Sequence, residues 1–189
     1  NNTAVGQGAL FSNVVGTQNT AVGTQALIDN TASGNTAVGF CAARCNVGGY
    51  GNTAIGRCTL RLNISGTGNT ALGDQALESN TVSGNTAVGT YAMESTTTGA
   101  NNTAMGFAAL VANTTGAENA AVGHSALRAN NIGSGNVGIG FYALRGNTAN
   151  NNTAVGGSAL RCNTTGTKNA ALGFASLTSN TTGTYNTGL

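Results

Sequence analysis

The side chains best able to do chemistry in this chain are one histidine, five acidic residues and four cysteines. His124 is the only histidine, and no catalytic triad or histidine-based metal cluster can be assembled around it without partners. Among the acidic residues, only Glu78 and Glu94 occupy equivalent places in neighbouring repeats. Such a carboxylate pair could serve glycoside hydrolysis, but two solvated glutamates on a surface are the simpler interpretation. We therefore predict no enzyme activity, no cofactor and no metal.

The cysteines are Cys41, Cys45, Cys58 and Cys162. Cys41 and Cys58 are equivalent residues of adjacent repeats, and stacked strands would bring their Cα atoms about 4.8 Å apart, within disulfide range. Parallel Cβ vectors aim poorly at each other, so a disulfide remains one alternative and free or partly buried thiols are the one that we favour. The close Cys-x-x-Cys pairs of a zinc site are missing from the sequence.

These side chains are carried by a repeat that fills the chain. Each unit opens with Asn-Thr-Ala-aliphatic-Gly or a close variant and is 16 or 17 residues long. The units begin at residues 2, 19, 35, 52, 69, 85, 102, 119, 136, 152, 169 and 186. We therefore treat residues 1–189 as a single array. Neither end resembles the caps that repeat arrays need, so we expect a segment of a longer fibre.

We number the positions of each unit from 0 at its opening asparagine. Position 3 is always aliphatic, position 4 is glycine in every complete unit, and positions 7, 8 and 11 are nearly always Ala, Leu and Asn. Positions 5, 6, 9 and 10 vary freely. This alternation indicates that like residues stack on like residues, while the variable positions face water.

The period favours a parallel β-solenoid. It is too short for repeats built from pairs of helices, which need about 33 residues or more. Antiparallel hairpins prefer Asn-Gly or Asp-Gly turns, and the sequence contains neither dipeptide. We therefore predict an all-β fold of about eleven coils, either a β-roll or a triangular β-helix, with strands at positions 1–3, around position 8 and at positions 12–13.

The strand at positions 1–3 must turn alternate side chains to opposite faces. We expect positions 1 and 3 to face the interior and the alanine of position 2 to form an outer strip suited to contact with another chain. The leucine of position 8 fills either the interior or that contact. Glycine at position 4 provides a corner with positive φ, and the asparagines at positions 0 and 11 adopt left-handed conformations or bond one another along the rod.

Composition excludes several partners. Only 6% of the residues are charged and the formal net charge is +2, whereas nucleic-acid binding needs clustered Lys and Arg. The sequence contains no run of about 18 apolar residues, so it does not predict a membrane-spanning helix.

Two sets of residues at variable positions are candidates for glycan or interchain contact. The aromatic set is Phe40, Phe107, Phe141, Phe174, Tyr91 and Tyr142, at positions 5 and 6. The basic set is Arg44, Arg61, Arg128, Arg145 and Arg161, at position 9. Interchain packing is the alternative that we favour for the aromatic set, and simple solvation for the basic one.

Glycosylation sequons are a further possibility, although a chain rich in Asn and Thr also produces them by chance. The candidate acceptors are Asn63, Asn101, Asn113, Asn151, Asn163 and Asn180. They matter only if the chain passes through a glycosylating pathway.

The repeat resembles two known families. Residues 19–27 and 152–160 contain Asn-Thr-Ala-Val-Gly-x-x-Ala-Leu, which resembles the head repeat of trimeric autotransporter adhesins, a left-handed parallel β-roll. The Asn-Thr-Thr-Gly that follows at 113–116, 163–166 and 180–183 resembles repeats of phage and large-virus tail fibres. The resemblance covers the whole chain and implies a homotrimeric fibre, at a cell surface, on a virion or elsewhere outside the cell, that presents or spaces a receptor-binding part.

We therefore expect a structural or adhesive fibre segment that attaches to a surface, with other copies of itself and a cell-surface glycan as partners. The alternative is a secreted, glycosylated filament whose copies join end to end or side by side. A lesser alternative is ice binding by ranks of threonine, which the expected inward direction of position 1 disfavours.

Overall fold

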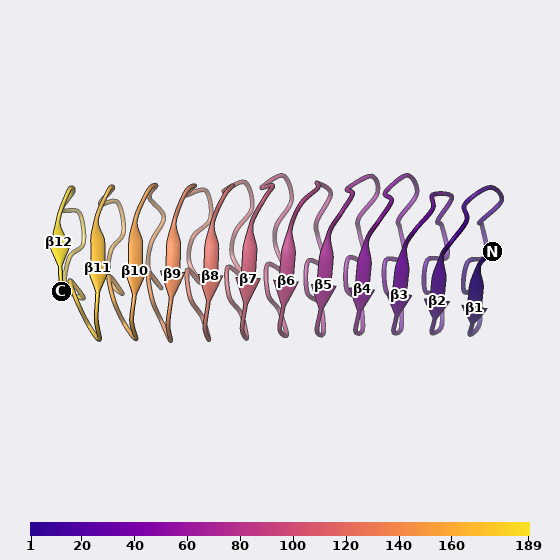
Figure 1. The fold of residues 1–189 in the computed structure, drawn as a ribbon, viewed down its shortest axis with the longest axis horizontal. Helices are drawn as coiled ribbons and strands as arrows, with labels where there is room; N and C mark the ends of the chain where they lie inside the picture. The colour runs from indigo at the N-terminus through magenta and orange to yellow at the C-terminus, as the bar shows by residue number, and fades with distance from the viewer.

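The computed structural model describes residues 1–189 as a rod with one β-strand in each coil (Figure 1). The strands are β1 (Thr3–Val5), β2 (Thr20–Val22), β3 (Thr36–Val38), β4 (Thr53–Ile55), β5 (Thr70–Leu72), β6 (Thr86–Val88), β7 (Thr103–Met105), β8 (Ala120–Val122), β9 (Val137–Ile139), β10 (Thr153–Val155), β11 (Ala170–Leu172) and β12 (Thr187–Gly188). They form one 12-stranded parallel sheet in sequence order. The predicted parallel β-solenoid is confirmed. No helix is long and apolar enough to cross a bilayer.

Each strand pairs in register with the next, so equivalent residues lie directly over one another. Ala21 of β2 pairs with Ala4 of β1 on one side and with Ala37 of β3 on the other. Figure 1 shows the strands following one another along one wall of the rod, from the N-terminus to the C-terminus. The stacking of like residues that the repeat predicts is therefore confirmed.

The rest of each coil consists of turns, and the additional strands predicted around position 8 and at positions 12–13 are wrong. Residues at positions 4, 6 and 8 have positive φ, as in Gly23 (132°), Gln25 (59°) and Leu27 (50°). Left-handed backbone costs an L-residue about 1–2 kcal/mol. Bonds between coils offset this cost, because the N–H of Leu27 still donates to the carbonyl of Ala42 at 3.0 Å.

Glycine at position 4 makes the predicted corner. Gly56 has a φ of +131°, and a Cβ placed on it would lie 2.5 Å from the carbonyl oxygen of Gly73 in the next coil. Backbone therefore stacks directly on backbone at this corner, and any side chain would separate the coils.

The strand faces the opposite way from the prediction. The alanines of position 2 are buried from the second coil onward, as in Ala54, and only Ala4 in the first coil is exposed. Positions 1 and 3 point outward, and Leu72 is 45% exposed. The leucine of position 8 explains the reversal, because it lies beneath the strand and leaves room for little more than a methyl group. At Gly138, which replaces the alanine, an added Cβ would meet the Cγ of Leu127 at 3.2 Å. The leucines of position 8 thus belong to the coil interior.

The interior is apolar on one side and amide-filled on the other. Its apolar part is a cluster of 27 buried residues, mainly the alanines of positions 2 and 7 and the leucines of position 8. The amide part consists of the buried asparagines of positions 0 and 11. These asparagines do not have the positive φ that the sequence suggested. They bond one another along the rod instead, which confirms the other expectation.

Two asparagine ladders result. At position 0 the N–H of Asn52 donates to Oδ1 of Asn35 in the preceding coil at 2.9 Å, and every later opening asparagine repeats this bond. At position 11 the Nδ2 of Asn63 donates to Oδ1 of Asn46 at 2.8 Å. Both Asn52 and Asn63 also donate to the carbonyl of Gly66 at 2.9 Å. The shared carbonyl joins the two ladders within each coil.

The difference between 16- and 17-residue units is absorbed next to this carbonyl. In a 17-residue unit Asn46 donates to the carbonyl of Gly49, three residues further on. In a 16-residue unit Asn30 donates to the carbonyl of Ala32, two residues further on. The short loop loses one residue after position 11, and the ladders keep their register.

Candidate functional site

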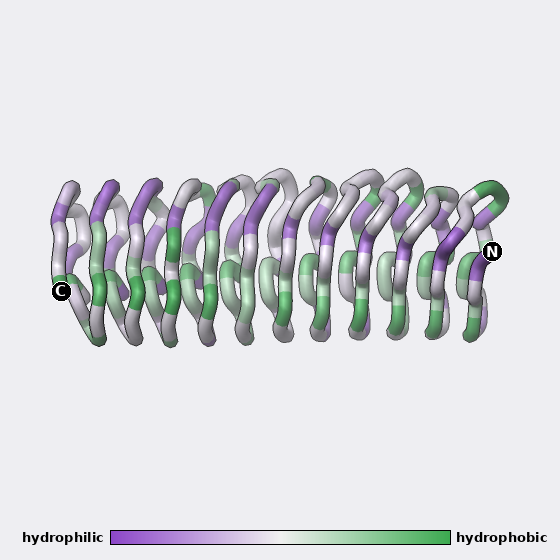
Figure 2. Tube along the Cα trace, in the orientation of Figure 1, coloured by the Kyte–Doolittle hydropathy of each residue, from purple (hydrophilic) through white to green (hydrophobic).

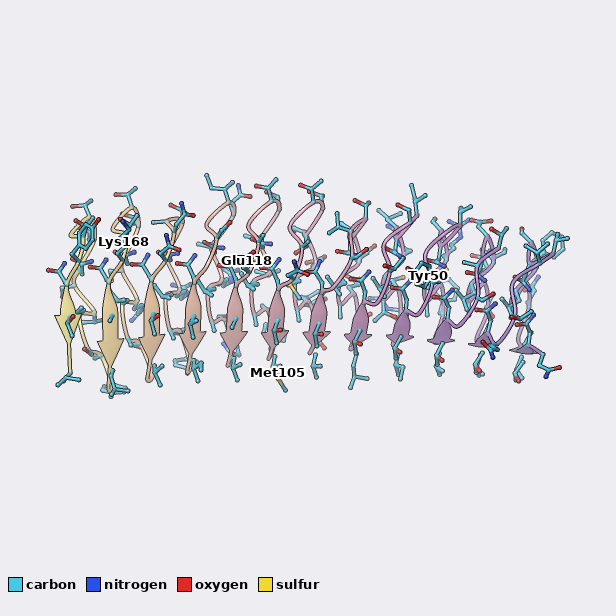
Figure 3. The ribbon with its side chains drawn as sticks, turned by 45° about the horizontal axis from the view of Figure 1, so that its top comes forward. Tyr50, Met105, Glu118 and Lys168 are labelled. Atoms are coloured by element: carbon cyan, nitrogen blue, oxygen red, sulfur yellow. The ribbon has the colours of Figure 1, made fainter.

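The outer face of the sheet carries a continuous row of aliphatic side chains from position 3, which we call the apolar stripe. Its members are Val5, Val22, Val38, Ile55, Leu72, Val88, Met105, Val122, Ile139, Val155, Leu172 and Leu189. Met105 projects from the end of its strand, at the edge opposite to Tyr50, Glu118 and Lys168 (Figure 3). Figure 2 shows hydrophobic colouring along this edge in most coils. The stripe is therefore an unpaired apolar surface along the rod.

A row of outward residues from position 1 lies beside the stripe. Thr53 and Thr70 are neighbouring members in β4 and β5 and are paired in register. The row is interrupted in three coils, by Ala120, Val137 and Ala170. A shallow apolar depression of about 270 Å³ lies at the C-terminal end of this face, between Val155, Leu172 and Leu189.

Beyond the glycine corner, rings from four consecutive coils form a second surface, the aromatic strip. Its members are Tyr91, Phe107, His124, Phe141 and Tyr142. His124 stacks on Phe107 with a centroid distance of 5.2 Å and lies 5.5 Å from Phe141. Phe141 and Tyr142 are 3.8 Å apart. Sequence reasoning missed His124 as a member, although its place at position 5 in register with Phe107 and Phe141 was visible.

The other predicted aromatic residues lie apart from this strip. Phe40 is exposed at the same position near the N-terminal end. Phe174 is 85% exposed and packs on the backbone of Gly157, where an added Cβ would lie 3.3 Å from its ring.

The arginines of position 9 fall into two groups. Arg61 is neutralised by Glu78, whose Oε1 lies 2.7 Å from its Nε, and nearby Arg57 pairs with Asp74 at 2.9 Å. Arg145 and Arg161 form no ion pair and lie over the ring of Tyr142, with their guanidinium carbons 4.9 and 5.5 Å from its centroid.

The remaining two arginines differ from each other. Arg128 is exposed, one coil before Arg145, and also lacks an ion pair. Arg44 is half-buried, and its Nε has no hydrogen-bond partner. Unpaired positive charge is thus concentrated in the C-terminal half of the position 9 column.

All four cysteines are free thiols. Cys41 and Cys58 are buried in adjacent coils without a disulfide between them. The Sγ of Cys41 donates to Oε1 of Gln25 at 3.3 Å, and burial, reinforced by Cys58, raises the pKa of the Cys41 thiol. Cys45 is half-buried and Cys162 is exposed. Cys41 and Cys58 are therefore placed as packing residues rather than as a disulfide-bonded pair.

The carboxylates and the histidine have different neighbours. Glu78 is held by Arg61, whereas burial, together with the charges of Glu78 and Asp74, raises the pKa of Glu94. His124 lies between two phenylalanine rings. No group of three or more His, Cys, Asp or Glu side chains is close enough together to hold a metal ion.

The six candidate glycosylation sites divide by burial. Asn63, Asn113 and Asn163 are completely buried members of the position 11 column, and each donates its Nδ2 to a glycine carbonyl. A glycan on any of them would break these bonds, so the folded rod cannot accommodate it. Asn101 and Asn151 are exposed and Asn180 is half-buried, and glycosylation of these three stays a prediction.

Comparison of the chain with protein-family models, with curated proteins and with solved structures finds no match in any of the three.

Proposed function

We propose that this chain is a structural segment of a fibre in which copies pack side by side, and that the fibre serves attachment to a surface. The apolar stripe is the observation that supports this most. Contiguous exposed apolar surface of this kind marks protein contact sites. Every coil contributes an aliphatic side chain to the stripe; Leu172 is 56% exposed, and four valines, Val22, Val38, Val88 and Val155, are half-exposed. A second surface would remove these side chains from water.

Another copy of the chain suits the stripe in spacing and in charge. Its side chains recur at about the 4.8 Å separation of neighbouring strands, so the stripe of a parallel copy has the same spacing. Burying an unpaired charge in an interface is costly. No member of the stripe is charged, so packing a second copy on it would not incur that cost. Three copies around one axis, as the repeat resemblance implies, would cover each stripe.

Sedimentation equilibrium on the purified 189-residue chain tests this proposal. We expect a trimer, and we expect the double variant Leu72→Ser with Ile139→Ser to dissociate because both changes place hydroxyls in the stripe. The matched control is Ile64→Ser with Ile132→Ser, which removes two exposed isoleucines from outside the stripe. A wild-type chain that stays monomeric at high micromolar concentration would refute side-by-side packing.

Ice binding is a second candidate, because the structure removes the objection that the sequence raised. The threonines of position 1 face outward with the stripe, for instance Thr70 beside Leu72. The two rows form a regular grid with spacings of about 4.8 Å along the rod and about 6.6 Å across it. Thermal hysteresis that Thr70→Tyr abolishes would favour this function, and its absence in the wild-type chain would dispose of it.

A further inference from the structure

We infer that Phe141, Tyr142, Arg145 and Arg161 form a binding site for an acidic saccharide, a sugar chain that carries carboxylate or sulfate groups. The inference deepens the attachment role proposed above. An isolated rod would carry the site as well as an assembled one, so the two proposals can fail separately.

The aromatic residues provide the apolar half of the site. Phe141 is exposed and Tyr142 half-exposed, and their rings lie 3.8 Å apart at an angle of 32°. The C–H groups on one face of a sugar ring pack well on such rings, because they present weakly positive hydrogens to the negative aromatic face. His124 and Phe107 continue the surface over two preceding coils, which gives an extended chain room for further contacts.

The arginines provide the charged half. Arg145 and Arg161 come from consecutive coils and converge on the ring of Tyr142. Neither has an acidic partner, and the Nε of Arg145 is buried without a hydrogen-bond acceptor. A guanidinium held over a ring keeps its outer N–H groups free for bidentate bonds to carboxylate or sulfate.

Charge along the rod favours an anion at this end. Residues 102–189 contain three arginines and one lysine but a single acidic residue, Glu118. Residues 1–101 contain three arginines and four acidic residues, and two of those arginines, Arg57 and Arg61, are already in ion pairs. A neutral sugar would leave the unpaired charge of Arg145 and Arg161 unused.

The contrast between the two pairs of arginines gives a matched test by biolayer interferometry. The immobilised probes are dextran sulfate, alginate as a carboxylated chain, and neutral dextran. We expect the wild-type chain to bind at least one acidic probe but not dextran, and to bind less as the salt concentration rises from about 50 to about 500 mM. Arg145→Gln with Arg161→Gln should weaken binding about tenfold or more, because both charge-assisted contacts are lost.

Two further variants separate a built site from general attraction. Arg57→Gln with Arg61→Gln removes the same charge from the rod and should leave binding unchanged. Phe141→Leu with Tyr142→Leu keeps apolar volume but removes the rings, and should weaken binding to the same probe.

The binding pattern across the probes and variants decides whether the site exists. Binding to dextran sulfate alone, to alginate alone or to both, with the pattern of losses given above, supports the site and identifies the acidic group. Equal losses in the two arginine double variants would show that only net charge matters and would overturn the inference. It is equally overturned if neither acidic probe binds, or if the Phe141 and Tyr142 variant changes the chain stoichiometry but not saccharide binding, since the strip would then be an interchain contact.

Discussion

Replacing Asn63 by alanine tests whether the amide ladders hold the rod together. Asn63 is fully buried, its Nδ2 donates to Asn46 Oδ1 at 2.8 Å and to the Gly66 carbonyl at 2.9 Å, and its Oδ1 accepts from Asn80 Nδ2 at 3.3 Å. Each buried bond contributes about 1 kcal/mol net, so losing three should lower the free energy of unfolding by about 3 kcal/mol.

Thr96 provides a control at the same repeat position. It is the one position 11 residue that is not asparagine, it is also fully buried, and its Oγ1 has no hydrogen-bond partner. Thr96→Ala removes a methyl group, which costs about 1 kcal/mol, together with an unsatisfied hydroxyl, whose loss returns a similar amount, so the net change should be near zero.

Urea unfolding followed by circular dichroism measures both variants, with the slope of the transition checked for a change in cooperativity. We expect a clear fall in the midpoint for Asn63→Ala and almost none for Thr96→Ala. Equal shifts in the two variants would refute the ladder argument, because they would show that only the lost volume matters at this position.

Three further predictions follow from particular contacts. Gly56→Ala should destabilise the rod by more than about 2 kcal/mol in the same urea assay, because the new Cβ would meet the Gly73 carbonyl; an unchanged midpoint would contradict the stacked corner. Glu94→Gln should raise the urea midpoint at about pH 7 but not at about pH 3. The pKa of Glu94 is raised in the folded state, so the free energy of unfolding falls as the pH rises through that pKa and the carboxyl ionises. Glutamine does not ionise and therefore removes this loss. Cys41 should react with iodoacetamide far more slowly than exposed Cys162, and faster as pH rises, because burial raises the pKa of the Cys41 thiol; mass spectrometry of labelled peptides would show equal rates if this were wrong.

The sequence was sufficient for the period, the parallel pairing and the stacking of like residues, because these depend on which positions are constant. It was insufficient for the direction of the strand. Alternation requires only that Ala71 and Leu72 face opposite ways, and a larger aliphatic side chain is ordinarily the buried one. The space beneath the strand decides the matter, and it is set by Leu60 and Leu77 of position 8, whose direction depends on left-handed backbone.

The same left-handed backbone explains why the turns that follow each strand could not be predicted from the sequence. Leucine is a poor choice for positive φ when considered locally, so Leu77 at φ 52° could not be anticipated from propensity. The asparagines of positions 0 and 11 were the residues expected to have positive φ. In the structure they lie in the interior instead, where their side-chain amides form hydrogen bonds along the rod. For the candidate site, register alone placed the aromatic and basic columns. Which arginines are paired depends on the three-dimensional structure, where Arg61 meets Glu78 but Arg145 and Arg161 meet only the ring of Tyr142.

The gap in the ladder at Thr96 has a mechanical consequence. Coils stacked along an axis carry a pulling force in series, so a stretched rod separates where two neighbouring coils hold each other least. The amide at this position would have bridged Asn80 on one side and Asn113 on the other, and Thr96 bridges neither. The same ladder has one other gap, between Asn13 and Asn30 at the N-terminal end. Under tension the interior of the rod should therefore fracture on one side or the other of the coil that begins at Asn85, and Thr96→Asn should move that break elsewhere.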